Sequence, residues 1–163
     1  MFGRSLSALG LAALIAGGGS VLVVFVLAFL QNLHASRLTE AVNGVNAIAT
    51  GALVYAQGKS PVDAFPPSAP LTPAEVPRGA RVADPPGTWD HMTWAALGFQ
   101  EQNAHYFCFA FDSQRSPQRS TFAARAHGDL DGDGERSTFE VRGEATADGA
   151  RLLPGLYVDR EVE

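Results

Sequence analysis

The sequence predicts an α+β fold in which a long N-terminal membrane-spanning helix continues as an amphipathic helix packed on a small antiparallel β-sheet. Three patterns support this prediction. A long apolar run occupies the first fifth of the chain, apolar residues then recur at helical spacing, and the C-terminal part alternates as half-buried strands do. The chain has 163 residues, which allows one domain and rarely two.

Composition excludes several classes of function. The 17 Asp and Glu against 12 Lys and Arg give a formal charge of −5, and only 18% of the residues are charged, so the chain is expected to fold. Lys59 is the only lysine and the arginines are scattered, so no basic patch is available and nucleic acid is not an expected partner. Cys108 is the only cysteine, which excludes an intramolecular disulfide.

The first element is predicted to cross a membrane. Residues 1–4 are expected to be a short cytoplasmic N-terminus, and residues 5–33 contain no charged or titratable side chain. A spanning helix needs about 20 such residues. The alternative, a cleaved secretory signal, has an apolar core of only about 7–15 residues. The length of the run therefore favours an uncleaved anchor.

The amphipathic continuation of this helix is predicted over residues 34–58. Its stripe begins at Leu38 and Ala41 and recurs with i, i+3, i+4, i+7 spacing as far as Leu53. Gly58 stands where a left-handed cap is expected. The stripe lasts barely three heptads without charged flanking positions, which disfavours a coiled coil and favours packing on a small domain.

Residues 59–89 hold eight of the ten prolines, which cannot donate backbone hydrogen bonds to a strand ladder. An extended or turn-rich crossover is expected there. Residues 90–163 are then predicted to form a short helix and an antiparallel sheet. Asp90 is the expected N-cap of that helix and Gly98 its C-terminal stop.

The sheet is predicted from alternation of side chains. Phe107, Phe109 and Phe111 share one face of a strand, and the same period recurs from Phe122, from Phe139 and over residues 152–158. Three or four short antiparallel strands are expected. Cys108 lies in the first of them with no neighbouring cation in sequence, so it is predicted to be a buried structural thiol.

One motif carries chemistry. Residues 129–140 match the calcium-loop pattern D-x-D-x-D-G followed by five residues and Glu. Carboxylates at alternate positions converge, a glycine at position six permits the turn, position seven offers a backbone carbonyl and position nine a hydroxyl or a bound water. Calcium accepts 6–8 oxygen ligands, whereas zinc prefers His or Cys. The predicted ligands are Asp129, Asp131, Asp133, Glu135, Ser137 and Glu140.

The flanks of this motif read as strands, and Arg136 stands where a helix–loop–helix site needs an apolar residue. A calcium loop between strands is therefore expected. The alternative is a hairpin turn whose aspartates only solvate its tip. His91, His105 and His127 are interpreted as plain surface residues.

Four segments carry a resemblance to a known family: SRLTEAVNGVNAIATGALVYAQ, FPPSAPLTP, the ALGF that precedes YFCFAF, and FAARAHGDLDGDGERSTFE. They resemble the type IV pilin-like proteins of deltaproteobacteria, the myxobacterial group especially. The resemblance implies an inner-membrane-anchored subunit with a long bent helix packed on an antiparallel sheet, and an ion-stabilised turn at Asp129, Asp131 and Asp133. The chain lacks the usual prepilin cleavage motif, and no acidic residue precedes Glu40.

The expected function follows from the resemblance and the loop. It is a structural subunit or accessory protein of a pilus or type II secretion-like system, with calcium bound. The expected partners are inner-membrane lipid and other pilin subunits or pilus assembly proteins. The expected location is the bacterial inner membrane, with a single pass and a C-terminal domain that is periplasmic or exposed on a filament.

The alternative is a non-assembling, inner-membrane-anchored periplasmic module that binds calcium or a partner. An enzyme is not expected, because the sequence has no nucleophile elbow, His-rich metal motif or nucleotide loop.

Overall fold

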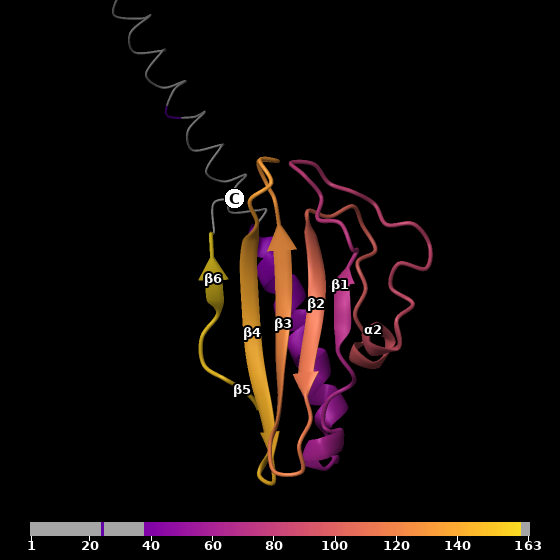
Figure 1. Ribbon diagram of the computed structural model, residues 1–163, viewed down its shortest axis with the longest axis vertical. Helices are drawn as coiled ribbons and strands as arrows, with labels where there is room; N and C mark the ends of the chain where they lie inside the picture. The colour runs from indigo at the N-terminus through magenta and orange to yellow at the C-terminus, as the bar shows by residue number, and fades with distance from the viewer. Residues whose placement is uncertain (1–23, 25–37, 161–163) are drawn as a thin grey trace, which may run out of the picture. The chain divides into compact units, whose positions relative to one another are not determined.

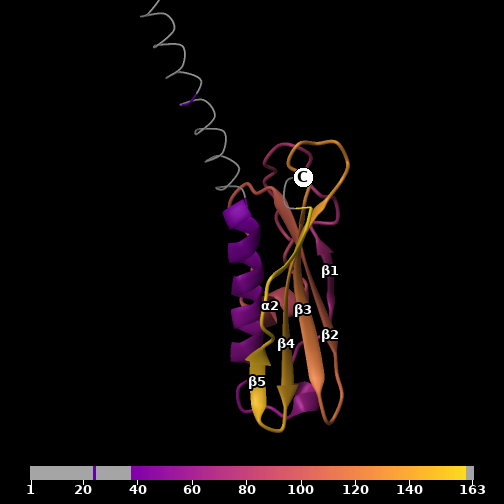
Figure 2. The same cartoon turned by 90° about the vertical axis from the view of Figure 1, so that its left-hand side faces the viewer.

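The computed structural model describes residue 24 and residues 38–160. A helix of residues 38–56, here called the packing helix, lies behind a twisted sheet in Figure 1 and beside it in Figure 2, so the two elements form two layers. The remaining elements are η1 (Pro61–Asp63), β1 (Ala69–Thr72), α2 (Met92–Leu97), β2 (Phe107–Gln114), β3 (Ser120–Gly128), β4 (Ser137–Thr146), β5 (Gly149–Leu152) and β6 (Tyr157–Asp159).

The sheet has six strands in the order β1-β2-β3-β4-β5, and β6 also pairs with β4. Every pairing is antiparallel. β5 pairs with residues 143–146 of β4 and β6 with residues 138–140, so the two short strands share one edge of β4. β2, β3 and β4 therefore form the continuous centre of the sheet.

The packing helix buries a face of small residues. Its fully buried apolar positions follow the predicted stripe, and two glycines lie on the same side. A Cβ at Gly44 would come within 2.1 Å of the Phe109 ring, and one at Gly51 within 2.1 Å of the Leu97 carbonyl oxygen. The aromatic rings of the sheet and the end of α2 thus approach the helix backbone directly. The buried stripe consists of Ala41, Val45, Ile48, Ala49 and Ala52.

The sheet presents aromatic rings to this helix. β3 alternates strictly between buried and half-buried residues, as expected for a strand with one covered face. Phe111 and Phe122 stack with their centroids 5.5 Å apart, and Phe107 meets Phe139 edge to face at 5.8 Å. These rings form one core with the helix stripe.

The structure corrects the membrane part of the prediction. Of residues 5–33, the expected spanning helix, all but residue 24 lie outside the described residues. In residues 38–160 the longest helix has 19 residues, and no helix there is long and apolar enough to cross a membrane. The packing helix is not apolar enough because polar residues line its exposed side: Thr39, Asn43, Asn46 and Thr50. The predicted fold with a long transmembrane helix and the predicted inner-membrane location are therefore wrong on the structure.

Two local expectations also differ from the structure. The proline-rich crossover contains β1, whose Pro70 is tolerated because this strand lies at an edge of the sheet. The N-cap of α2 is His91, not Asp90: the His91 side chain accepts a hydrogen bond from the Thr93 N–H. Gly98 ends α2 in the left-handed conformation, as predicted.

Candidate metal centre

The loop between β3 and β4 lies at one end of the sheet (Figure 1). The last pair of the two strands is Gly128 with Ser137, and the chain between them turns through two glycines with positive φ, +85° at Gly132 and +98° at Gly134. An L side chain at either position would be strained. The sequence Asp-Gly-Asp-Gly at residues 131–134 therefore permits a tight turn that brings alternate side chains together.

Three aspartates converge in this turn. One carboxylate oxygen from each of Asp129, Asp131 and Asp133 lies within 4.8 Å of the others. Asp129 is only 2% exposed, whereas the other two face solvent. Three acidic groups this close repel one another unless a cation lies between them. The triad could hold a metal ion.

Backbone hydrogen bonds orient each of the three carboxylates. Asp129 accepts from Gly132 N–H at 2.7 Å and from Gly134 N–H at 3.1 Å, one bond to each oxygen. Asp131 accepts from Asp133 N–H at 3.1 Å, and Asp133 accepts from Glu135 N–H at 2.7 Å. An ionised carboxylate has about four lone-pair positions, so these bonds leave acceptor capacity for a cation.

The proline-rich crossover supports the loop from the side. Gly79 N–H donates to the Asp129 carbonyl oxygen at 2.8 Å, and Arg78 and Asp129 form a parallel bridge. A cavity of about 300 Å³ lies beside this contact, between Glu75, Arg78 and Arg136. The position of Asp129 is therefore set by a segment some 50 residues away in sequence.

The side chains of the other three predicted ligands have partners outside the triad. Both oxygens of Glu140 are paired with arginines, one with Arg125 Nε and the other with Arg142 Nε, in the middle of the sheet. The Glu135 carboxylate pairs with Arg160. The ligand atom predicted at this position is the backbone carbonyl oxygen, and it stays a prediction. The buried Ser137 hydroxyl donates to the Gly128 carbonyl oxygen at 3.2 Å.

Glu140 lies away from the aspartates because a strand, β4, follows the loop. Residues that are two apart in a strand share a face, so Glu140 and Arg142 both lie on the face opposite the packing helix. A helix after the loop would instead turn position twelve back toward the aspartates. The strand pattern of STFEV, already visible in the sequence, was the signal for this difference.

His105, Asp84 and Trp89 form a buried polar cluster that the sequence did not predict. His105 is 1% exposed, not at the surface as expected. Its Nδ1 lies 2.7 Å from the Phe107 carbonyl oxygen and its Nε2 lies 2.9 Å from Asp84 Oδ2. Asp84 also accepts from Trp89 Nε1 at 2.7 Å. Neither ring nitrogen of His105 is open to a substrate.

Cys108 and His127 are also held in place by their surroundings. Cys108 is fully buried, as predicted, and burial raises the pKa of its thiol to about 12, so it stays protonated at neutral pH. His127 Nδ1 lies 2.9 Å from Oγ1 of Thr138, its cross-strand partner on β4.

The fold and the loop define a two-layer α+β domain with an acidic turn that could hold a cation. No family model matches the chain, and no curated protein or solved structure is significantly similar to it. The resemblance to pilin-like proteins stays a prediction.

Proposed function

We propose that this chain is a calcium-stabilised structural protein and not an enzyme: a pilin-like subunit or an accessory protein of a pilus or type II secretion-like assembly. The observation that carries the calcium part is the convergence of three aspartate oxygens within 4.8 Å. The structural part is supported by a helix packed on an antiparallel sheet through small residues. It is also supported by the burial of His105 and Cys108, whose ring nitrogens and thiol have partners within the fold.

Calcium fits the loop better than magnesium does. The turn offers one buried and two exposed aspartates in an irregular arrangement, and calcium tolerates irregular geometry and completes its shell with water. Magnesium requires near-ideal octahedral ligands at shorter distances. Because the carboxylate of Glu140 is taken by two arginines, the ligand charge is lower than the motif suggests. The expected Kd is therefore in the weak range of about 10⁻⁴ to 10⁻³ M.

Thermal unfolding of the full chain tests the calcium assignment. With about 10 mM calcium the melting temperature is expected to rise by about 4 °C or more, because a cation bound only to the folded state stabilises it. Magnesium at the same concentration is expected to produce a smaller shift. Identical melting curves in calcium and in chelator would contradict the proposal.

Self-association separates the structural subunit from the alternative, a non-assembling module that binds calcium or a partner. Sedimentation velocity of the full chain over a range of concentrations is the suitable measurement. A subunit is expected to form species larger than a monomer as concentration rises. A monomer at every concentration, with calcium present, would favour the alternative.

A further inference from the structure

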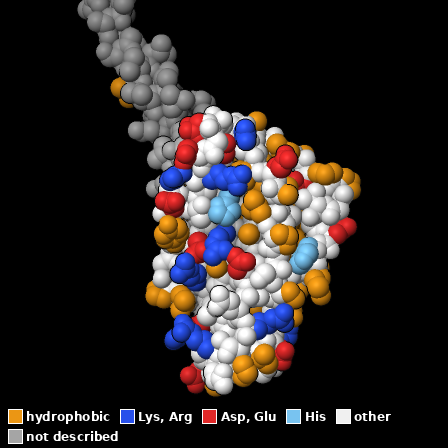
Figure 3. All heavy atoms as spheres, in the orientation of Figure 1, with side chains coloured by type: hydrophobic (Ala, Val, Ile, Leu, Met, Phe, Trp, Pro, Cys, Tyr) orange, Lys and Arg blue, Asp and Glu red, His pale blue; other side chains and the backbone are white. Residues whose placement is uncertain are grey.

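The face of the sheet away from the packing helix carries a groove that the proposed function does not use. Figure 3 views this face, on which basic and acidic side chains lie next to one another. The groove has a volume of about 330 Å³ and runs across β2, β3 and β4. We call it the arginine groove and define it by Arg119, Thr121, Ala123, Arg125, Arg142 and Leu153.

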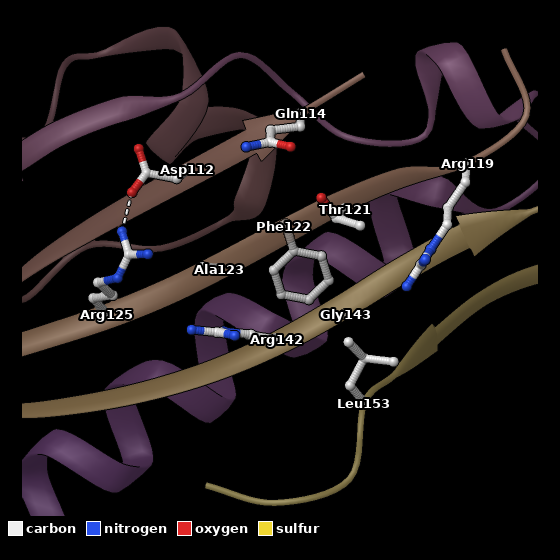
Figure 4. Close-up of a pocket in the computed structure, with 10 residues that line it drawn as sticks. All are labelled: Asp112, Gln114, Arg119, Thr121, Phe122, Ala123, Arg125, Arg142, Gly143 and Leu153. Atoms are coloured by element: carbon white, nitrogen blue, oxygen red, sulfur yellow. Dashed lines mark hydrogen bonds and ion pairs between the residues drawn. The ribbon is translucent and has the colours of Figure 1, made fainter. Parts of the chain in front are cut away.

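The groove is hollow because of the side chains at its centre. Thr121 and Ala123 are the two outward residues of β3 here, and both are short. Figure 4 shows the long side chains at the margins: Arg125 and Arg142 come from neighbouring strands on one side, and Arg119 lies on the other. Leu153 adds an apolar wall. The groove thus has a floor of short side chains, with three arginines at its margins and one carboxylate, Asp112, that pairs with Arg125.

Two buried glutamates hold the arginine side chains. Glu140, with 4% of its side chain exposed, pairs with Nε of both Arg125 and Arg142. Arginine side chains fixed in this way lose little conformational entropy when a ligand binds.

Glu144 performs the same role at the other end of the groove. Its carboxylate lies 2.7 Å from Arg119 Nη2 and accepts two hydrogen bonds from Arg151. Hydrogen bonding from Arg151 and the charge of Arg119 lower the pKa of Glu144, so this carboxylate stays ionised at neutral pH.

Donor capacity remains after these pairings. Arg142 makes its hydrogen bond through Nε, and among residues 38–160 its two terminal nitrogens have no hydrogen-bond partner. Its side chain is 62% exposed. The cluster also keeps one surplus positive charge in a protein of net −5, since four arginines meet three carboxylates: Arg119, Arg125, Arg142 and Arg151 against Asp112, Glu140 and Glu144.

We propose that the arginine groove binds a carboxylate group carried by a small apolar body, with Arg142 as its principal donor. The planar guanidinium matches a carboxylate with two parallel hydrogen bonds. Ala123 and Leu153 offer apolar surface for the body of the ligand. This site is separate from the aspartate loop and does not depend on calcium.

An NMR titration of the full chain with butyrate, which carries one carboxylate on a short apolar chain, tests the proposal in calcium-free buffer. Saturable shifts are expected at backbone amides of residues 121–125 and 140–144. Arg142→Gln is expected to weaken the binding about tenfold, because charge-assisted hydrogen bonds are lost. Arg142→Lys, which keeps the charge without the planar fork, should fall in between.

Arg115→Gln is the matched control, because Arg115 is exposed and does not line the groove. It should leave the affinity unchanged. Three results would overturn the proposal: no saturable shift at these amides, equal affinity in the Arg142→Gln variant and the wild type, or sulfate binding as tightly as butyrate.

Discussion

The Glu40 carboxylate accepts a hydrogen bond from the Tyr106 backbone N–H at 2.6 Å, and the same oxygen accepts one from Phe107 N–H at 3.2 Å. The contact joins the first turns of the packing helix to the start of β2, across 66 residues of sequence. The other oxygen of Glu40 lies 3.7 Å from Arg81. A single acidic side chain therefore ties the helix, the sheet and the crossover together.

Replacement of Glu40 is expected to destabilise the fold. Glu40→Ala leaves two backbone donors without this acceptor, which should cost about 2–3 kcal/mol in the free energy of unfolding. Glu40→Gln keeps an acceptor oxygen and should cost about 1 kcal/mol. Denaturant unfolding measures both, with the exposed Asn43→Ala as the control on the same helix. A Glu40→Ala loss no larger than that of the control would contradict the role of this contact.

The substitution Gly44→Ala is expected to destabilise the fold, although alanine is the better helix former. A Cβ at this position would lie 2.1 Å from the buried Phe109 ring. Overpacking of this kind should cost about 1–3 kcal/mol, more than the propensity gain of about 1 kcal/mol. Asn46→Ala, on the exposed side of the same helix, should have the opposite sign. Equal effects of the two substitutions in denaturant unfolding would argue against the close helix–sheet approach.

His127 is expected to make stability depend on pH below neutrality. Burial lowers its pKa, and the charges of Arg125 and Arg136 lower it further. The unfolded chain takes up this proton near pH 6.5, the folded protein only at lower pH. Stability contributed by the neutral ring is therefore present above about pH 6.5 and is lost as pH falls through the folded pKa.

The measurement is the free energy of unfolding between pH 7 and pH 5 in the wild type and in His127→Gln. Glutamine stays neutral and can still bond Thr138, so the variant should show the shallower fall. Other titrating groups contribute equally to both proteins. Parallel profiles would show that His127 is not the responsible group.

Local patterns predicted much of the sheet and the buried helix face. The alternation of apolar side chains predicted strands at Phe107 to Phe111 and from Phe122, and β2 and β3 lie at these positions. The stripe from Ala41 to Ala52 is the buried side of the packing helix. These patterns are local, because each strand or helix has one covered face that repeats with its own period. The long membrane-spanning helix was the part that the structure contradicts.

Features that depend on distant partners were not predictable in this way. In the sequence Glu40 is only a polar residue outside the apolar stripe, because its contact with the start of β2 is distant along the chain. His105 was predicted at the surface because its partner Asp84 is also distant along the chain. For the site, the three aspartates and the turn followed from the spacing alone. The pairing of Glu140 with arginines on two strands depends on strand register, which a single sequence does not specify.

Isothermal titration of the full chain with calcium, in the wild type and in Asp131→Asn, is the strongest test of the proposed metal centre. Asparagine keeps the oxygen that accepts from Asp133 N–H but removes the charge. Asp148→Asn removes one charge from an exposed turn outside the loop and serves as the control. We predict one calcium site in the wild type and in the control, with a Kd of about 10⁻⁴ to 10⁻³ M, and a loss of binding of about tenfold or more in Asp131→Asn. Equal calcium binding by all three proteins, or none in the wild type, would contradict the account.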